Sequence, residues 1–208
     1  MHGDGLAWMH EHPALPSTSV ITSLPDSTEL AQLGFDAWRS WFVAAASAVL
    51  AWLPDDGFAI FYQSDTLHDR AWVDKAHLVS LAADATSAAL AWHKIVCRQP
   101  AGASSWGRAS YSHVLCFTRG AVPRLREASP HVLAEEGTKS WTRGMGRAAC
   151  ELACNYLRAH TQTRRIVDPF CGHGSALAVA LGMGFDVIGV ELSVKRCRVA
   201  RTTLTRAT

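Results

Sequence analysis

The sequence lacks an apolar run long enough to cross a membrane. Even the alanine-rich stretch 41–53 falls short of the ~20 residues that span a bilayer. The N-terminal residues lack a basic region followed by an apolar core, so we expect no secretory signal. They do not resemble an Arg-rich transit peptide either, because Asp4 and Glu11 come early. The sequence also has no internal repeat and no low-complexity tract.

The cysteines lack the spacing of a disulfide framework or a zinc site. None of the 6 cysteines forms a Cys-x-x-Cys pair. Cys150 and Cys154 are four positions apart on an expected helix, which favours buried thiols over metal ligands. His10 and His12 are two positions apart and would point in different directions on a helix, so we expect no metal. The cysteines indicate an intracellular, reducing compartment: cytoplasm, nucleus or an organelle.

Charged residues make up only 18% of the 208 residues, and they are unevenly distributed. Residues 1–90 hold 3 Lys/Arg against 11 Asp/Glu, a net −8, whereas residues 91–208 hold 17 against 7, a net +10. This asymmetry predicts a basic face for a polyanion, unless the fold interleaves the two halves. The length and the 49% hydrophobic content fit a single well-buried domain over residues 1–208.

The clearest pattern is a glycine loop at residues 165–175, which read Arg-Ile-Val-Asp-Pro-Phe-Cys-Gly-His-Gly-Ser. An apolar run, a Gly-x-Gly and an alanine-rich segment predict a strand, a tight loop and the N-terminus of a helix. A second apolar run, 185–191, ends at Glu191, near the ~20-residue offset at which a carboxylate meets a ribose diol. The third glycine of the dinucleotide fingerprint is absent, since Leu177 stands there. An ordinary strand–turn–helix without a ligand is the alternative.

Strands and helices alternate along the rest of the chain. We expect strands within 17–26 and at 58–62, 89–96 and 111–117, helices at 35–53, 71–83, 141–160 and 175–183, a loop at 98–110 and an irregular stretch at 121–140. The alternation predicts an α/β fold with a mostly parallel sheet covered on both faces. The pair formed by 89–96 and 111–117 predicts one antiparallel edge strand.

The motif Asp-Pro-Phe-Cys-Gly-x-Gly-Ser closely resembles motif I of Rossmann-like S-adenosylmethionine-dependent methyltransferases. The form with Asp-Pro-Phe belongs to amino-methyltransferases of the N6-adenine/N4-cytosine type. The glycine loop comes late in the chain, and in this the sequence resembles the circularly permuted members of the family. Those members carry a Gly-Asp pair and an Asn/Asp/Ser-Pro-Pro-Tyr/Phe loop before motif I. Gly3-Asp4 and Ser23-Leu24-Pro25-Asp26 fall in those places.

The resemblance implies a seven-stranded-type sheet and a division of the chain into three parts. Residues 1–120 would form the catalytic half, 121–140 an irregular excursion, and 141–208 the half that binds S-adenosyl-L-methionine. In that family Asp168 would accept from the ammonium of the cofactor, Glu191 would hold the ribose hydroxyls, and Asp4 would hold the adenine amino group. Phe170, Gly172 and Gly174 complete the expected cofactor loop.

The resemblance also implies a catalytic loop, Ser23, Leu24, Pro25 and Asp26. A side-chain acceptor and a backbone carbonyl there draw a base amine toward tetrahedral geometry, and an aromatic residue stacks the base. This chain departs from the pattern, because Leu24 replaces the first proline and Asp26 replaces the aromatic. Asp26 therefore has a second interpretation, as a capping-box partner of Glu29.

Aromatic and cationic residues alternate around the expected hairpin. Candidate substrate-binding residues are Tyr62, Lys94, Arg98, Trp106, Arg108 and Tyr111. Rings beside phosphate-binding charges are what unpaired nucleic acid needs, and Tyr62, Trp106 or Tyr111 would replace the missing aromatic. The alternative is a solvated basic hairpin with core tryptophans.

The sequence therefore predicts a methyltransferase that acts on nucleic acid at a base amine. RNA is favoured, because the chain has no room for the separate target-recognition domain of many DNA-modifying relatives. A catalytically silent subunit that binds RNA or protein is one alternative, and a DNA, protein or small-molecule methyltransferase is another. A protein partner that supplies recognition stays open.

Overall fold

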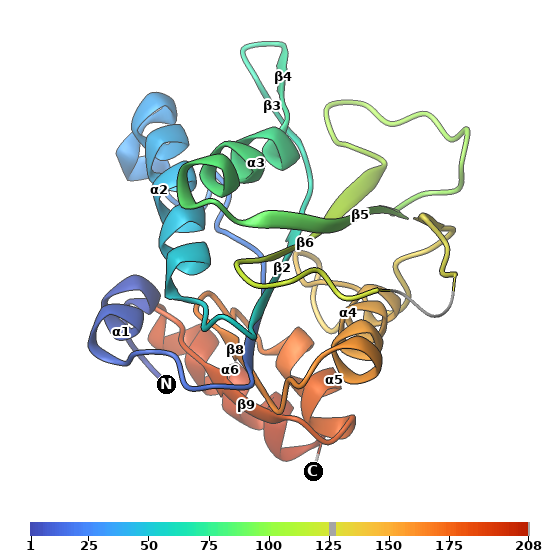
Figure 1. Cartoon of the computed structure of the whole chain (residues 1–208). Helices are drawn as coiled ribbons and strands as arrows, with labels where there is room; N and C mark the ends of the chain where they lie inside the picture. Colours follow the sequence, from blue (N-terminus) through green and yellow to red (C-terminus); the bar gives the residue numbers. More distant parts are fainter. Residues whose placement is uncertain (125–127, 208) are drawn as a thin grey trace.

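The computed structural model describes residues 1–124 and 128–207. It is built on one sheet of seven strands in the spatial order β7-β5-β6-β2-β1-β8-β9 (Figure 1). These are β1 (Thr18–Thr22), β2 (Phe58–Gln63), β5 (Ala89–Cys97), β6 (Tyr111–Thr118), β7 (Val132–Leu133), β8 (Arg165–Asp168) and β9 (Asp186–Gly189). A separate hairpin of β3 (Thr66–His68) and β4 (Ala71–Val73) projects from the body between β2 and α3. The helices are α1 (Gly5–Glu11), the short 3₁₀ helix η1 (Ala31–Leu33), α2 (Phe35–Trp52), α3 (Lys75–Thr86), α4 (Arg147–His160), α5 (Ser175–Gly182) and α6 (Val194–Thr205).

The strand directions confirm the predicted α/β class and correct one detail of it. β1 is parallel to both β2 and β8, β8 is parallel to β9, and β5 is parallel to β7. Among the strands of this sheet in the described residues, β6 alone is reversed, and it is antiparallel to both of its neighbours, β2 and β5. The reversed strand therefore lies inside the sheet, and the expectation of an antiparallel edge strand is wrong. The loop at 98–110 lets β6 return between β2 and β5, where both of its edges find backbone partners.

The order of the strands along the chain differs from their order in space. β8, which carries the glycine loop, lies beside β1 although it comes late in the sequence. The sheet thus takes strands from both predicted halves of the chain. The circular permutation itself, and the division at 120 and 140, stay predictions.

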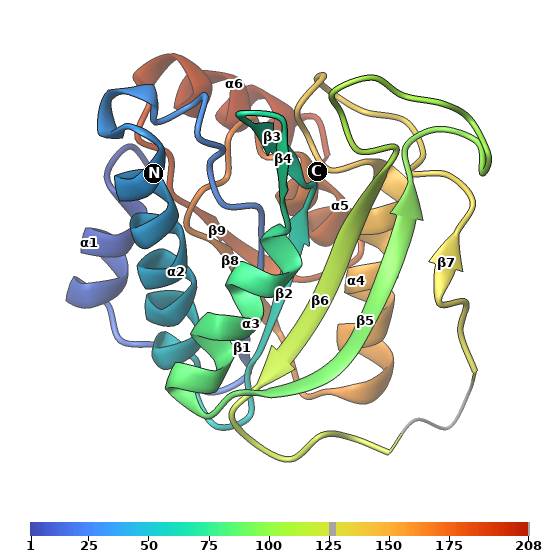
Figure 2. The same cartoon turned by 90° about the horizontal axis from the view of Figure 1, so that it is seen from above.

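Helices cover the sheet on both faces (Figure 2), and each face has its own apolar core. α1, α2 and α3 lie on one face, against strand residues such as Val20, Phe61 and Leu115. α4, α5 and α6 lie on the other, where Ile21 and Tyr62 point. Neighbouring strand residues alternate between the two cores, because successive side chains of a strand point to opposite faces.

Most predicted elements are present, and the differences have local causes. The expected helix at 71–83 is the strand β4 followed by α3, which begins later because Asp74 caps it by accepting from the His77 amide at 2.9 Å. The expected helix at 141–160 begins only at Arg147. Part of the irregular stretch, 125–127, lies outside the described residues, and the rest of it contributes the short strand β7 to the sheet edge.

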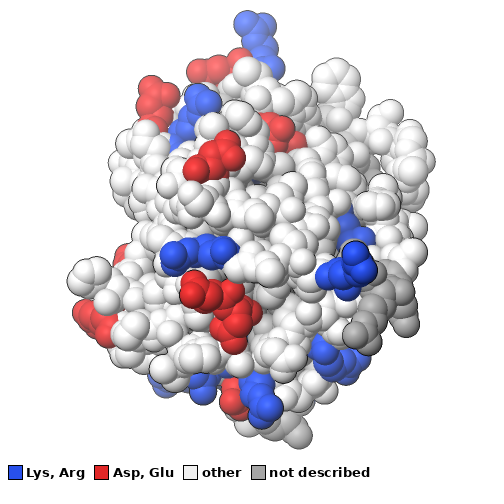
Figure 3. Space-filling view, in the orientation of Figure 1, with Lys and Arg blue, Asp and Glu red and all other residues white. Residues whose placement is uncertain are grey.

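The expected basic face is not seen on the side drawn in Figure 3, where basic and acidic side chains are interspersed. The interleaving of the two halves in the sheet explains this mixing. The six cysteines are free, and Cys150 and Cys154 are buried in the α4 core, as expected. In the described part of the chain, no helix has both the length and the apolar character to cross a membrane.

Candidate functional site

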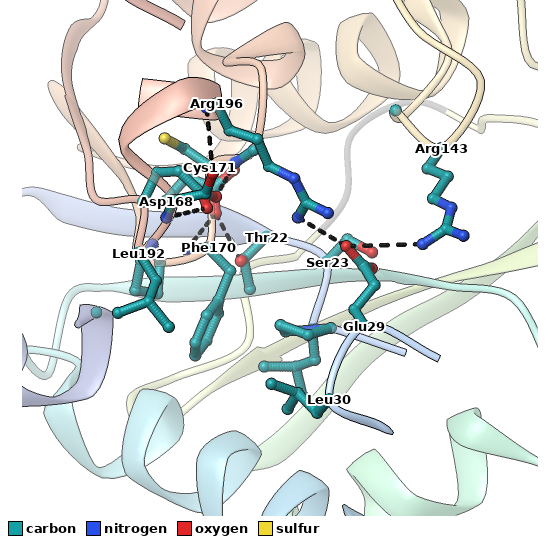
Figure 4. A pocket seen from close by; sticks show the side chains of 18 of the residues that line it. Thr22, Ser23, Glu29, Leu30, Arg143, Asp168, Phe170, Cys171, Leu192 and Arg196 are labelled. Atoms are coloured by element: carbon teal, nitrogen blue, oxygen red, sulfur yellow. Dashed lines mark hydrogen bonds and ion pairs between the residues drawn. The ribbon is translucent and has the colours of Figure 1, made fainter. Parts of the chain in front are cut away.

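A cavity of about 620 Å³ opens at the carboxyl ends of β1 and β8 (Figure 4). Its walls come from the residues after β1, β8 and β9, from the N-terminus of α1, and from the segment before α4. From β1 the chain proceeds to β2 on one side, and from β8 it proceeds to β9 on the other. Such a reversal of strand order leaves a crevice at which open α/β sheets bind ligands.

The glycine loop forms one wall of the cavity, and its backbone needs glycine at two positions. Gly172 has φ +54° and Gly174 has φ +77°, in the left-handed region that other residues rarely adopt. Gly174 then serves as the N-cap of α5. The loop is tied to the end of β9, because the Cys171 amide donates to the Val190 carbonyl at 3.0 Å. The predicted strand–loop–helix is thereby confirmed.

Asp168, at the end of β8, is a buried carboxyl in the cavity wall. Its Oδ1 accepts from the Thr22 hydroxyl at 2.6 Å and from the Phe170 amide at 3.1 Å. Among the described residues, none donates to its Oδ2, which leaves that oxygen for a ligand. Burial raises the pKa of Asp168 to about 7, and the Thr22 and Phe170 hydrogen bonds oppose this shift while the Glu191 charge adds to it.

Glu191 and Asp4 bring two more carboxylates to the same cavity. Glu191 follows β9 and accepts from the Gly172 amide at 3.0 Å and the Ser193 amide at 2.8 Å. Asp4 caps α1, with Oδ1 accepting from the amides of the two residues that follow Gly5, each at 2.9 Å. In the described part of the chain, Oδ2 of Asp4 has no donor. The three carboxylates predicted to bind the cofactor therefore line one space.

The loop after β1, here called the acceptor loop and comprising Ser23–Asp26, forms the opposite wall. Ser23, Leu24 and Pro25 line the cavity. No described residue donates a hydrogen bond to the Ser23 hydroxyl or to the Leu24 carbonyl. The Pro25 carbonyl is engaged, since it accepts from the indole of Trp38 at 3.1 Å. Two residues with unpaired acceptors, Ser23 and Leu24, thus line the same cavity.

Asp26 does not line the cavity; its carboxylate lies against α3. Its Oδ2 accepts from the Lys75 ammonium at 2.5 Å, and its Oδ1 accepts from the Thr28 amide at 3.2 Å. The Asp26 amide donates to the Glu29 carboxylate at 3.4 Å, but the Glu29 amide donates to the backbone carbonyl of Asp26 at 2.8 Å. Only one of the two capping-box bonds is therefore present, and a turn follows rather than an α-helix. Burial tends to raise the pKa of Asp26, but Lys75 and the hydrogen bonds outweigh it and lower that pKa. A direct catalytic role for Asp26 stays a prediction.

The mouth of the cavity holds residues that are not among the predicted site residues. Arg196 donates to Glu29 at 2.7 Å and lies over the Trp141 ring, with 5.5 Å between its guanidinium carbon and the ring centroid. Trp141 stacks on His173 at a centroid distance of 4.3 Å, and Arg143 lies 4.0 Å from Glu29. Figure 4 shows both arginines reaching toward Glu29. The position of Arg143 and Arg196 at the cavity could not be predicted, because both lie in segments expected to be helical, where charged side chains normally face solvent.

The six residues predicted to bind substrate do not line the cavity. Tyr62 is buried and donates to Glu136 at 2.9 Å, and Tyr111 donates to Asp65 at 3.0 Å. Lys94 is 6% exposed, and its ammonium donates to the carbonyl of Pro130 at 2.6 Å and to the hydroxyl of Ser129 at 2.9 Å. The remaining three, Arg98, Trp106 and Arg108, belong to the loop between β5 and β6, where Trp106 is 98% exposed. Their contact with substrate stays a prediction.

A second polar cluster lies at the start of α3 and of β6. His113 lies 3.1 Å from Oδ2 of Asp65, and His93 lies 3.0 Å from the other ring nitrogen of His113. Ligand-type atoms of Asp65, Asp74 and His113 lie within 4.8 Å of one another. Each of these three is already hydrogen-bonded to the chain, Asp65 to the Lys75 amide and Asp74 to the His77 amide. The cluster is therefore satisfied as a hydrogen-bonded support beneath the N-terminus of α3.

No protein-family model and no curated protein matches the chain. Solved structures do match it over nearly its whole length. A candidate DNA modification methylase from Thermus thermophilus, in complex with S-adenosyl-L-methionine, is 17% identical, with a TM-score of 0.73 over 99% of this chain and 94% of that one.

Two further structures give the same match. The PvuII DNA methyltransferase, which is cytosine-N4-specific, is 16% identical, with a TM-score of 0.73 over 97% of this chain and 84% of that one. M1.HpyAVI in complex with SAM is 12% identical, with a TM-score of 0.67 over 98% of this chain and 97% of that one. The chain therefore has the Rossmann-like fold of these methyltransferase structures, as the resemblance at motif I predicted.

Proposed function

We propose that this chain is an S-adenosylmethionine-dependent methyltransferase that acts on an exocyclic amine of a base in DNA. The observation that carries the proposal is that one cavity joins a carboxylate-bearing glycine loop to two unpaired acceptors. Asp168, Glu191 and Asp4 lie on its cofactor side, and Ser23 and Leu24 lie on its acceptor side. Each set fits one of the two reactants of an amine methylation.

The residues present fit the cofactor. The unpaired Oδ2 of Asp168 suits an ammonium group, and the unpaired Oδ2 of Asp4 suits the amino group of an adenine. Glu191 retains acceptor capacity on both oxygens, as a ribose diol requires. Gly172 and Gly174 allow the backbone to approach a ligand closely. When bound, S-adenosylmethionine supplies an electrophilic methyl group on a positively charged sulfur.

The acceptor loop supplies what the amine needs. The lone pair of a base amine is delocalised into the ring, so the amine must be drawn toward tetrahedral geometry before it can react. The Ser23 hydroxyl and the Leu24 carbonyl would accept the two N–H groups and orient the nitrogen. Holding two reactants in line is a large part of what an enzyme contributes to such a transfer.

DNA fits better than the RNA that the sequence analysis favoured. RNA was preferred because the chain has no room for a separate target-recognition domain. However, this chain covers 94% of the candidate DNA modification methylase, so that protein is of similar size. The PvuII enzyme is also named for DNA, and the comparisons offer no support for RNA.

A silent subunit remains the second candidate, because one feature of the acceptor loop favours it. Asp26 stands where the family has an aromatic residue, and the carboxylate points to Lys75 instead of the cavity. Without a ring at this position, the target base would need another stacking partner. Trp41 and Phe170, which line the cavity with their ring centroids 6.0 Å apart, are rings already present there.

The direct test is methyl transfer from isotopically labelled S-adenosylmethionine to duplex DNA, single-stranded DNA and total RNA. Nucleoside mass spectrometry would then identify the labelled base. We expect label on N4 of cytosine or N6 of adenine in DNA. Label in RNA alone would contradict the DNA assignment, and cofactor binding without label in any nucleic acid would favour the silent subunit.

A further inference from the structure

Lys75 is a buried lysine whose charge is directed at the acceptor loop. It is the first residue of α3 and is only 3% exposed. Its ammonium donates to Asp26 at 2.5 Å and lies 5.7 Å from the centroid of the Trp38 ring. In the described part of the chain, Asp26 is the one carboxylate that pairs with it.

A second attachment of the acceptor loop lies beside this ion pair. Trp38 is fully buried in α2, and its indole donates to the Pro25 carbonyl at 3.1 Å. α2 and α3 therefore each hold one residue of the acceptor loop, and Lys75 touches both attachments. Ser23 and Leu24, the two unpaired acceptors, come immediately before this anchored end.

Stability alone does not explain a charged pair in this position. A buried ion pair must overcome the desolvation of both charges, and apolar residues of similar size often stabilise a fold as well or better. What the pair adds is a defined geometry, since a charged hydrogen bond fixes both direction and distance. A fixed geometry matters most where a reacting nitrogen must be held in line.

We infer that Lys75 is a positioning residue for methyl transfer, which holds Asp26 and thereby fixes the Ser23 hydroxyl and the Leu24 carbonyl toward the substrate amine. This inference rests on the proposed methyltransferase function. It assigns Asp26 to the support of the acceptor loop, so that Lys75 and Asp26 act as one unit. Asp26, which stands where the family has a stacking aromatic residue, would then anchor the acceptor loop.

The test is a double-mutant cycle of Lys75→Met, Asp26→Asn and the double variant, with Lys75→Arg as the conservative change. We expect Lys75→Met to lower kcat about tenfold or more while the cofactor Kd stays within about twofold, because the transition-state contacts of Ser23 and Leu24 would be misaligned. The double variant should lose about as much as either single variant, because the pair acts as a unit. Lys75→Arg should recover most of the activity. Arg147→Met, which removes an exposed ion pair with Glu151 on α4, is the matched control and should match wild type.

A second readout does not depend on activity. The indole N–H resonance of Trp38, assigned in nuclear magnetic resonance spectra with Trp38→Phe, reports its bond to the Pro25 carbonyl. It should shift in Asp26→Asn, which keeps the Lys75 charge beside the Trp38 ring, and in Lys75→Met, and it should stay in place in Arg147→Met. If Lys75→Met does not fold, Asp26→Asn and Lys75→Arg carry the same comparison.

Three results would overturn the inference. They are a wild-type kcat in Lys75→Met, an unchanged Trp38 resonance, or losses that multiply in the double variant. A wild-type protein that methylates no nucleic acid would instead refute the proposed function. In that case the Trp38 resonance still decides whether Lys75 positions the loop.

Discussion

Asp168 should make cofactor affinity depend on pH near neutrality. Its pKa is raised to about 7, so near and below this pH the carboxyl is protonated in the folded protein. An ammonium group binds the ionised form, which means that affinity should rise with pH up to about 7 and then level off. Below that pH the change should approach about tenfold per unit. Isothermal titration with S-adenosylhomocysteine between pH 5.5 and 8.5 measures it.

Asp168→Asn is the control for this effect, because it has the same shape and does not titrate. Its affinity should be lower at pH 8 and nearly independent of pH. The free energy of unfolding gives an independent check. Since the pKa of Asp168 in the folded protein lies above the usual aspartate value of 3.8, the folded state retains a proton that the unfolded chain releases. The free energy of unfolding should therefore fall as the pH rises from about 4 to about 7. A wild-type profile as flat as that of Asp168→Asn would contradict the raised pKa.

Glu191 should contribute to cofactor binding through charged hydrogen bonds. Replacing it by Gln keeps the size but removes the charge and places an amide where one carboxylate oxygen accepts from Gly172 or Ser193. We expect a loss of about 1.5–3 kcal/mol of binding free energy per charged hydrogen bond. Isothermal titration measures the loss, and Glu151→Gln on the exposed face of α4 is the control. Equal affinity in both variants would remove Glu191 from the ribose site.

At the scale of elements, α1 is locked onto the glycine loop through a glycine. A Cβ at Gly5 would lie 2.0 Å from the Pro169 carbonyl oxygen, which is too close for any side chain. Gly5→Ala should therefore push α1 outward and move Asp4 away from the cavity. Overpacking of this kind costs about 1–3 kcal/mol of stability. That loss corresponds to about 2–4 °C in Tm per kcal/mol for a chain of this size.

Gly3→Ala is the matched control, because a Cβ there would lie 4.0 Å from its nearest neighbour, Val190. Its Tm and cofactor Kd should equal those of wild type. Gly5→Ala should lower the Tm and also weaken cofactor binding. If Gly5→Ala lost stability but kept full affinity, Asp4 would not contribute to the cofactor site.

Local signals in the sequence singled out the residues of the proposed cofactor side of the cavity. Asp168, Gly172 and Gly174 lie within one strand–loop–helix unit, whose geometry follows from a few consecutive residues. Glu191 comes shortly after the next strand, β9, at the offset that the unit requires. α1 was not predicted, because seven residues give little periodicity and the cap at Asp4 is the main signal.

Contacts that join distant segments could not be predicted. Lys75 is 49 positions from Asp26, and nothing near either residue indicates that they meet. Arg196 and Glu29 are 167 positions apart, yet they meet at the mouth of the cavity. The interior position of β6 could not be predicted for the same reason. The hairpin pattern indicates that β5 and β6 pair, but it does not indicate that β2 lies on the other side of β6.

At the scale of the whole molecule, the sheet brings both halves of the chain to one crevice. The acceptor loop comes from the acidic first half, and the glycine loop comes from the basic second half. Interleaved strands mix the two charge signs, as seen on the face in Figure 3. Attraction for a polyanion must then depend on particular cations, of which the loop between β5 and β6 offers Arg108, which is exposed, and Arg98, which is partly buried.

This leads to a prediction about the salt dependence of DNA binding. Each phosphate contact to duplex DNA contributes about 0.9 to the slope of log affinity against log salt. Arg108 is exposed on the loop, so Arg108→Ala should lower the slope by about that amount if it contacts a phosphate. Lys94→Ala should leave the slope unchanged, because the Lys94 ammonium is bonded to Ser129 and Pro130.

Trp106 tests whether the loop between β5 and β6 binds nucleic acid or is only a solvated connection. A stacking contact with an unpaired base is worth about 1–3 kcal/mol, so Trp106→Ala should weaken binding to single-stranded DNA by that amount at every salt concentration. Since the ring is 98% exposed, its loss should not change the Tm, and any effect belongs to binding. Fluorescence anisotropy across a salt series measures both terms. Unchanged slopes in Arg98→Ala and Arg108→Ala, with unchanged affinity in Trp106→Ala, would leave the loop as a solvated connection between β5 and β6.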